Sequence, residues 1–274
     1  MSNLYVQALH VHPVKSVAGT APDEVAVEPW GLSGDRRWAL VDSGGTVITQ
    51  RQQPRLALAA ARPAGGGRIA VSAPGMAELV VELPGPGPLE PVVLFGKKVE
   101  TVVAASAAAD WFSAYLGVPA RLVHLDDPAV RRPVDPDYAL PGETVSLADA
   151  YPLLITTLAS LDALNALIAR GDHPQEGPLP MNRFRPNVVV SGAEAWAEDG
   201  WRRIAIGDAV FRGVRECGRC VITTTDQRTA ERGKEPLKTL AVHRRIGKSL
   251  AFGRQLVPVR LGTVRVGDEV RILE

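Results

Sequence analysis

Two cysteines, Cys217 and Cys220, lie three residues apart, and no other cysteine occurs in the 274 residues. Disulfides that hold small secreted domains together are usually more numerous and more widely spaced. The pair therefore points to a reactive thiol or a metal ligand. Arg219 precedes Cys220 directly, and a fixed cation beside a thiol lowers its pKa by stabilising the thiolate.

Other interpretations of the pair remain open at this point. A Cys-x-x-Cys redox dithiol usually has its first sulfur at a helix N-terminus, whereas the β-branched residues 221–225 predict a strand. A structural zinc site needs four ligands, but there is no second such pair and the five histidines lack zinc-ligand spacing. Free cysteines are also often buried as small apolar side chains. The neighbouring arginine favours a reactive thiolate over simple burial.

The composition restricts the class of protein. The net charge is +1, from 31 basic and 30 acidic residues, so the chain has no broad basic surface for nucleic acid or an anionic membrane. No apolar run approaches the roughly 18 residues of a membrane-spanning helix, and residues 1–5 lack the pattern of a signal peptide. We therefore expect a cytoplasmic protein with no nucleic-acid or membrane partner.

Short alternating runs predict that the first part of the chain is almost entirely β. Predicted strands in this part, separated by turn residues, cover residues 4–12, 24–28, 38–42, 46–49, 68–72, 78–83 and 99–103, with a hairpin turn at 43–45. A helix is predicted to begin with Ser106 as its N-cap and to end at Gly117. We place a domain boundary there, with an N-terminal β domain over residues 1–117 and a second domain over 118–274.

The second part mixes strands and helices, which predicts an α+β fold that is mostly β. Its predicted strands cover residues 120–124, 187–191, 203–206, 209–214 and 220–225, with two short ones within 262–272. Leucines at helical spacing predict a helix over 158–168 that Gly171 ends, and Pro236 is expected to begin another towards Ile246. The proline-rich, polar residues 126–142 predict a loop over a functional site.

Three polar clusters lie next to predicted strands, and each combines a cation with a hydroxyl or an amide. Any one of them could be a solvated turn. Arginine matches phosphate oxygens in geometry and lysine adds a point charge, so their convergence would bind a phosphate or a polyanionic cofactor. The clusters are Pro13-Val14-Lys15-Ser16, Gly34-Asp35-Arg36-Arg37-Trp38 and Asn182-Arg183-Phe184-Arg185-Pro186-Asn187.

Ten short motifs follow one another in a fixed order from about residue 4 to residue 273. They are Pro13-Val14-Lys15-Ser16, Gly31-Leu32-x-Gly34-Asp35-Arg36-x-Trp38, Gln50-Arg51-Gln52-x-Pro54-Arg55-Leu56, Arg185-Pro186-Asn187, Glu198-Asp199-x-Trp201, Ile206-Gly207, Cys217-x-Arg219-Cys220, Glu235-Pro236-Leu237, Phe252-Gly253 and Val266-Gly267-Asp268. In this order they resemble the MOSC family with its N-terminal β-barrel domain. That group includes the mitochondrial amidoxime-reducing component and bacterial proteins that detoxify N-hydroxylated bases.

The resemblance implies a β-barrel-like N-terminal domain, a mixed MOSC β-barrel domain with a few helices, and a molybdenum cofactor (Mo-molybdopterin) between them. Cys220 is implied as the direct metal ligand. Implied cofactor contacts, carried over residue by residue, are Lys15, Ser16, Arg36, Ala150, Tyr151, Arg185, Asn187, Gly218, Arg219 and Cys220. Ala150-Tyr151 replaces a Thr-Ser pair of close relatives and Gly218 replaces a serine. Hydroxyl contacts there are altered, while backbone contacts could remain.

The implied reaction is reduction of the N–O bond of a small N-hydroxylated substrate, which consumes two electrons and two protons. Asp226, shortly after Cys220, is the expected catalytic carboxylate for proton delivery, although aspartates at strand ends also cap turns. The chain has no ferredoxin, haem or dinucleotide motif. We therefore expect a separate electron donor, such as a ferredoxin, a cytochrome or a flavoprotein reductase.

A second function remains open, because some MOSC domains have been proposed to carry sulfur as a cysteine persulfide towards metal-cofactor assembly. That role needs only the thiol and a path by which other molecules can reach it. The cations Lys15, Arg36 and Arg185 are expected only where a cofactor phosphate binds, so their position in the fold separates the two functions.

Overall fold

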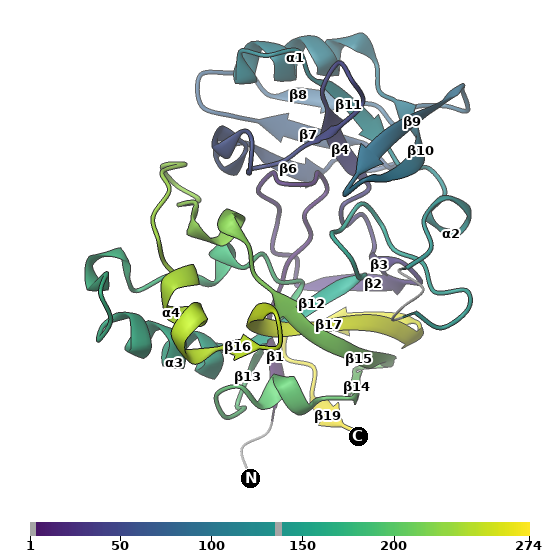
Figure 1. Ribbon diagram of the computed structural model, residues 1–274. Coiled ribbons are helices and arrows are strands. Elements are labelled where there is room, and N and C mark those ends of the chain that lie inside the picture. The colour runs from purple at the N-terminus through teal and green to yellow at the C-terminus, as the bar shows by residue number, and fades with distance from the viewer. Residues whose placement is uncertain (1–3, 135–138) are drawn as a thin grey trace.

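The computed structural model describes residues 4–134 and 139–274, which form two β-rich regions, one above the other in Figure 1. The expected α+β fold, mostly β with a few helices, is confirmed. The described residues contain four α-helices, which are α1 (Ser106–Leu116), α2 (Pro128–Arg131), α3 (Leu158–Ile168) and α4 (Leu237–His243). In Figure 1, α1 covers the upper region while α3 and α4 lie beside the lower one.

The lower region is built on the largest sheet, whose strand order is β1-β13-β12-β17-β15-β14-β19, with β16 paired to β17. These strands are β1 (Tyr5–Leu9), β12 (Leu153–Thr157), β13 (Val188–Ser191), β14 (Arg203–Ile206), β15 (Ala209–Gly218), β16 (Arg245–Ile246), β17 (Ser249–Arg260) and β19 (Val270–Ile272). A small sheet in the order β18-β2-β3 combines β18 (Gly262–Arg265), β2 (Glu24–Glu28) and β3 (Gly31–Leu32). The buried core includes Leu9, Ile155, Val188, Phe211 and Leu256.

The upper region contains a five-stranded sheet in the order β5-β4-β11-β10-β9 and a three-stranded sheet in the order β6-β7-β8. The strands are β4 (Trp38–Val41), β5 (Val47–Ile48), β6 (Ala60–Pro63), β7 (Ile69–Ser72), β8 (Leu79–Val81), β9 (Leu89–Leu94), β10 (Lys97–Val103) and β11 (Arg121–His124). Its core includes Trp38, Leu40, Leu56, Phe112 and Leu122, so one face of α1 packs against the strands.

The chain does not divide cleanly into these two regions at one point. β1 lies in the lower sheet, antiparallel to β13, before the chain enters the upper region. β11 follows α1 but pairs with β4 and β10 in the upper sheet. The boundary between residues 117 and 118 stays a prediction, and the pairs that cross it are β1 with β13, β2 with β18, and β11 with β4 and β10.

Most predicted elements are confirmed, including the 43–45 turn, where Asp42 Oδ1 accepts hydrogen bonds from the backbone N–H groups of Gly44 and Thr46, both at 2.9 Å. Some predictions differ from the structure. Ser106 is the first residue of α1 rather than its N-cap, and α4 ends at His243 rather than near Ile246. The predicted loop over 126–142 contains α2, and its residues 135–138 lie outside the described residues.

Candidate functional site

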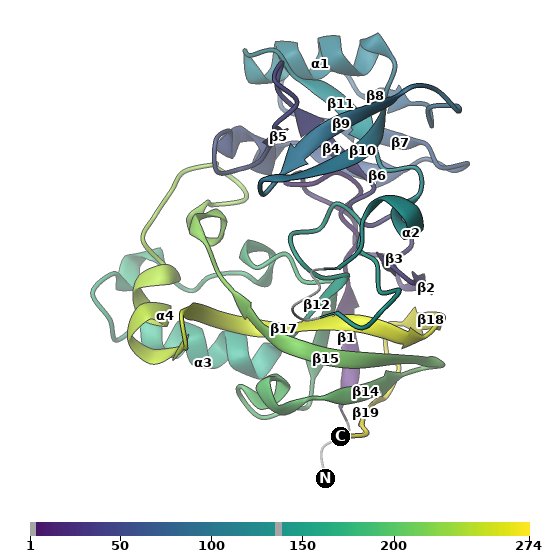
Figure 2. The same cartoon turned by 45° about the vertical axis from the view of Figure 1, so that its right-hand side comes forward.

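A pocket of about 110 Å³ is lined by residues near Lys15, Arg36 and Tyr151 and by the end of β15. Figure 2 shows β15 reaching from the lower region towards the upper one. The pocket is lined by all ten residues expected to contact a cofactor, which are Lys15, Ser16, Arg36, Ala150, Tyr151, Arg185, Asn187, Gly218, Arg219 and Cys220. Asp149, Cys217 and Phe184 also line it. The polar clusters therefore converge, as the sequence predicts, and Cys220 lies among them.

Backbone hydrogen bonds bring the first two polar clusters together. Lys15 N–H donates to Trp38 O and Arg36 N–H donates to His12 O, both at 2.8 Å. Leu147 N–H in turn donates to Arg36 O at 2.8 Å. Because these pairs satisfy the backbone of three distant segments, they fix Lys15, Arg36 and the 147–151 segment side by side.

The third cluster and the cysteine pair are placed by the large sheet. Asn187 N–H donates to Leu154 O just before β13, at 2.8 Å, and Arg219 N–H donates to Leu250 O in β17, at 2.8 Å. Asn187 is almost fully buried, and its Oδ1 accepts a hydrogen bond from Leu154 N–H at 3.1 Å. The start of β13 and the end of β15 thus place Asn187 and Arg219 at the pocket, with β12 and β17 between these strands in the sheet.

Three non-glycine pocket residues have left-handed backbone conformations. The φ angles are 67° at Ser16, 49° at Arg36 and 51° at Arg185. Side chains with a Cβ rarely adopt this region, and such residues gather at sites where the surrounding structure over-determines them. Here two of the three strained residues, Arg36 and Arg185, are arginines that line the same pocket.

The arginines of the pocket are held mainly by neutral oxygens. Arg36 donates to Asn187 Oδ1 at 3.2 Å and to Arg185 O at 3.1 Å, and Arg185 donates to Val17 O at 2.9 Å. Arg36 also pairs with the buried carboxylate of Asp35. Burial lowers the pKa of Arg185, and the charge of Arg36 lowers it further. Crowded cations of this kind favour the arrival of an anion.

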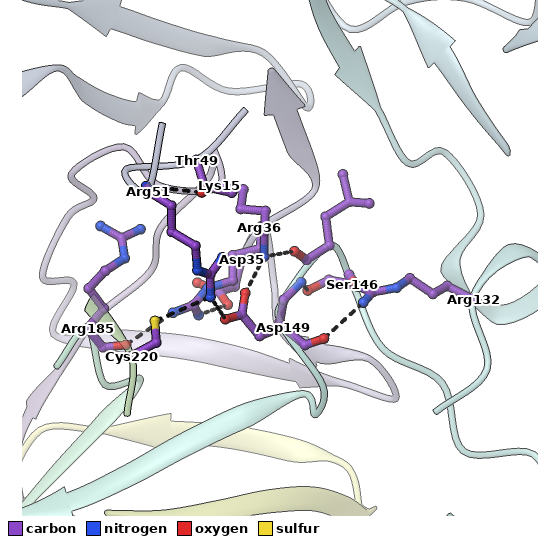
Figure 3. Close-up of polar contacts among 12 residues, drawn as sticks. Lys15, Asp35, Arg36, Thr49, Arg51, Arg132, Ser146, Asp149, Arg185 and Cys220 are labelled. Carbon is purple, nitrogen blue, oxygen red and sulfur yellow. Dashed lines mark hydrogen bonds and ion pairs between the residues drawn. The ribbon is translucent and has the colours of Figure 1, made fainter. Parts of the chain in front are cut away.

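Lys15 has a different partner, the carboxylate of Asp149, and it also donates to Leu147 O at 2.9 Å (Figure 3). Burial lowers the pKa of Lys15 to about 8, and the charge of Asp149 opposes this shift. Arg132 donates to Ser146 O and Asp149 O and so holds the 146–149 segment in place. No motif or spacing in the sequence marks Asp149 as a site residue.

Each thiol faces a different arginine, which corrects the expectation that Arg219 stabilises Cys220. Arg219 Nη1 lies 2.9 Å from Cys217 Sγ, whereas Cys220 Sγ lies 3.2 Å from Arg51 Nη2 (Figure 3). Both cysteines are free and half-buried. Burial raises the pKa of Cys217 despite the charge of Arg219. Arg51 was missed as a site residue, although it stands in the Gln50-Arg51-Gln52 motif.

The residues after Cys220 do not form the predicted strand. Val221–Thr224 is a short 3-10 helix, in which the Thr223 hydroxyl donates to Cys220 O and the Thr224 hydroxyl donates to Val221 O, both at 2.9 Å. Threonine hydroxyls that bond nearby carbonyls offer the backbone an alternative to a sheet ladder. This local bonding overrides the β-propensity of the run, and Ile222 and Thr223 of the short helix line the pocket after Cys220.

Asp226 does not belong to the lining of the pocket. It pairs with Arg183 Nη2 at 2.8 Å and accepts hydrogen bonds from the backbone N–H groups of Arg228, at 2.7 Å, and Thr229, at 3.1 Å. Burial acts to raise the pKa of Asp226, but these bonds and the charge of Arg183 lower it overall. Asp226 thus caps a turn, and its role in proton delivery stays a prediction.

The two departures from the family pattern are tolerated locally. Tyr151 is buried in a small apolar cluster with Val134, Val145 and Val257, which gives its large ring a place. A Cβ added at Gly218 would lie 3.1 Å from Ser249 Oγ. A hydroxyl group is therefore already present beside Gly218, supplied by β17.

A metal at Cys220 would need most of its ligands from a bound cofactor. In residues 4–134 and 139–274, no three His, Cys, Asp or Glu side chains gather as a metal-binding group. None of the helices that the structure describes is both long and apolar enough to cross a bilayer.

Two family descriptions match the chain, "MOSC N-terminal beta barrel domain" over residues 3–119 and "MOSC domain" over residues 142–271. Human "Mitochondrial amidoxime-reducing component 1" is 34% identical over 286 residues, which cover 98% of this chain and 82% of that protein. The chain belongs to the MOSC family. Other relatives with MOSC-family similarity are rat "Mitochondrial amidoxime reducing component 2", 33% identical with 97% and 82% covered, and rice "Molybdenum cofactor sulfurase", 28% identical with 92% and 32% covered.

The two MOSC-family matches divide the pocket between them. Lys15, Ser16 and Arg36 lie within the first matched range, as does Arg51, which contacts Cys220, and the lining residues from Asp149 to Cys220 lie within the second. The pocket is therefore complete only where both matched ranges meet.

Proposed function

We propose that this protein is a molybdenum-cofactor-dependent oxidoreductase that reduces N-hydroxylated compounds with electrons from a separate donor protein. The observation that carries the proposal is the convergence of Lys15, Arg36 and Arg185 with Cys220 in one pocket. Relatives named as amidoxime-reducing components, similar over nearly the whole chain, support the substrate class.

The residues of the pocket fit such a cofactor. Arg36 and Arg185 would hold its phosphate through charge-assisted hydrogen bonds. Cys220 would supply a soft thiolate to the metal, and Arg51 at 3.2 Å would stabilise and orient that thiolate. The buried Nε of Arg219 has no hydrogen-bond partner among the described residues. Its N–H is therefore free to donate to a ligand bound beside Cys220.

The reaction consumes two electrons and two protons, breaks the N–O bond and releases the oxygen as water. When bound, the cofactor would supply the two-electron redox chemistry, while the protein positions the substrate and excludes competing reactions. The electrons would come from a ferredoxin, a cytochrome or a flavoprotein. Asp226 is our sequence-based candidate for proton delivery, and Asp149 is the carboxylate on the described pocket lining.

The sulfur-carrier alternative is less well supported. A persulfide carrier needs Cys220 and access to it, but gives no reason for the charge of Arg185, which lines the same pocket and donates to Val17 O rather than to a carboxylate. Withdrawing a charge from water is costly without a partner of opposite charge, so a bound anion explains Arg185 better. The rice relative named as a molybdenum cofactor sulfurase is only 32% covered by this chain.

The test is to purify the protein from a host that makes molybdenum cofactor and to measure molybdenum and pterin per chain. We expect about one of each, and reduction of benzamidoxime with a reduced viologen dye but not with NADH alone. Arg185→Ala should lower cofactor occupancy, because it removes a charge-assisted contact worth roughly 1.5–3 kcal/mol.

Arg62→Ala is the matched control, since Arg62 forms an exposed pair with Glu78 at 2.7 Å outside the pocket. Its occupancy should equal that of the wild type. Absence of molybdenum and pterin from the wild type would contradict the proposal, as would full occupancy in Arg185→Ala.

A further inference from the structure

A loop that follows the short helix after Cys220 holds a turn of the upper region. The loop covers residues 225–233 and is closed by a backbone hydrogen bond from Asp226 N–H to Glu231 O at 2.7 Å. The turn covers residues 49–53 and follows β5. Because this turn contains Arg51, the contacts between the loop and the turn decide where Arg51 lies.

A reciprocal pair of glutamine amides joins the loop to the turn. Gln227 Nε2 donates to Gln50 Oε1 at 3.1 Å, and Gln50 Nε2 donates to Gln227 Oε1 at 3.2 Å. Gln50 is fully buried, and its Nε2 also donates to Ser16 O at 2.8 Å. A glutamine amide has two N–H donors and one acceptor oxygen, and at Gln50 each of them has a partner. The pair therefore connects the loop with Ser16, which lines the pocket.

Arg232 fixes the backbone of the same turn. Its Nη2 donates to Gln50 O at 2.5 Å and to Arg51 O at 2.8 Å. Arg51 N–H in turn donates to the hydroxyl oxygen of Thr49 at 3.2 Å (Figure 3). Both backbone polar groups of Arg51 are thus satisfied within the turn, and its side chain extends towards the pocket from a fixed backbone.

The side chain of Arg51 lies between two acceptors of unequal strength. Its Nη2 is 3.2 Å from Cys220 Sγ and 3.6 Å from Asp149 Oδ2. A carboxylate is a stronger partner for a guanidinium group than a sulfur atom is, because its bonds are charge-assisted and can be bidentate. An unrestrained Arg51 would therefore move onto Asp149. Since the sulfur keeps its contact, the attraction of Asp149 alone does not set the position of Arg51.

We propose that Gln50, Gln227 and Arg232 are positioning residues that hold Arg51 on the sulfur of Cys220 and so fix the direction of the thiol. Hydrogen bonds from outside a metal site orient its ligands in this way. The value of this orientation for metal ligation rests on the proposed function. The contact itself belongs to the cofactor-free protein and can be measured there.

The direct measurement is the infrared S–H stretching band of Cys220 in cofactor-free protein, with Cys217→Ala leaving a single thiol. The sulfur is a weak acceptor, and the frequency of the band depends on its hydrogen bonds. Arg51→Ala should shift the band, because it removes the N–H donor. Gln227→Ala should shift it in the same direction. Adding Gln227→Ala to Arg51→Ala should cause no further shift, because the glutamine acts through the arginine.

An amide pair that only attached the loop to the turn would affect the unfolding temperature and leave the band unchanged. An unchanged band in Gln227→Ala would therefore overturn the proposal, as would an additional shift of equal size in the Arg51→Ala background. Gln7→Ala removes an exposed amide from β1 and is the matched control, which should keep the band of the wild type. If Gln227→Ala does not fold, Arg232→Ala provides the same comparison from an exposed position.

Turnover of the cofactor-loaded protein separates this inference from the proposed function. Gln227→Ala should lower the rate of benzamidoxime reduction per bound molybdenum about tenfold, the usual effect of losing a group that orients a metal ligand. A shifted band in a protein that binds no molybdenum would leave the positioning standing and refute the proposed function. Reduction of benzamidoxime at the same rate in Gln227→Ala and the wild type would leave the proposed function standing and refute the positioning.

Discussion

The two sides of the pocket hold their cations in different ways. On the C-terminal side, Arg185 and Arg219 donate to the backbone carbonyls Val17 O and Phe184 O. On the N-terminal side, Lys15 and Arg51 face the carboxylate of Asp149. A carbonyl leaves the charge of its donor unbalanced, whereas a carboxylate neutralises it. The positive charge on the C-terminal side is therefore unbalanced and favours an anion. The positive charge on the N-terminal side is balanced by Asp149, and an anion would have to compete with that carboxylate.

The cysteines provide the largest expected difference, because Cys220 contacts the opposite side through Arg51 while Cys217 contacts only its own side through Arg219. Cys220→Ala should abolish reduction of benzamidoxime by removing the thiolate that we propose as the metal ligand. Cys217→Ala should keep substantial activity, since the pKa of that thiol is raised by burial. Steady-state rates per bound molybdenum provide the measurement. Equal losses in both variants would indicate a dithiol mechanism.

Lys15 gives a smaller effect that depends on pH. Burial lowers its pKa to about 8, so Lys15 is charged below that pH and becomes neutral above it. An anion binds the charged form, and the affinity of the cofactor-free protein for pyrophosphate should therefore fall severalfold as the pH rises through about 8. Calorimetry at a series of pH values measures the change. Lys15→Arg stays charged and should flatten the profile, so identical profiles for the two proteins would argue against Lys15.

The smallest effect on turnover is expected at Asp226, which lies outside the pocket lining. Asp226→Asn weakens the pair with Arg183 and should lower stability by about 1 kcal/mol, while the rate per bound cofactor stays near that of the wild type. Thermal unfolding and kcat together decide the result. A large loss of kcat at unchanged occupancy and Tm would instead support the proton-delivery role predicted from the sequence.

The fold and most of the pocket could be predicted because the decisive residues stand in short motifs next to strand signals. Lys15, Arg36 and Arg185 converge as predicted. Arg51 and Asp149 were missed because their roles depend on contacts between segments far apart in the chain. No sequence pattern reports that Arg51 reaches Cys220 across 169 positions.

Local rules failed where tertiary contacts overrode them. β17 was not predicted, since Gly253 and Pro258 interrupt its β signal. Gly253 adopts φ 78°, and a Cβ there would lie 2.8 Å from Ile155 O, so the strand needs glycine for close approach to β12. Register shifts in the β15–β17 pair accommodate the irregular strand.

The pairing of β1 with β13 has a consequence for biosynthesis. Tyr5 pairs with Ser191, so β1 leaves the ribosome well before the strand that it pairs with has been made. Ribosomes add roughly 5–20 residues per second, which leaves this edge unpaired for on the order of ten seconds or more. The upper region, whose strands all come from residues 38–124, can assemble during that interval. Newly made chains thus complete the large sheet after the upper region, and the pocket, which includes the end of β15, is complete only then.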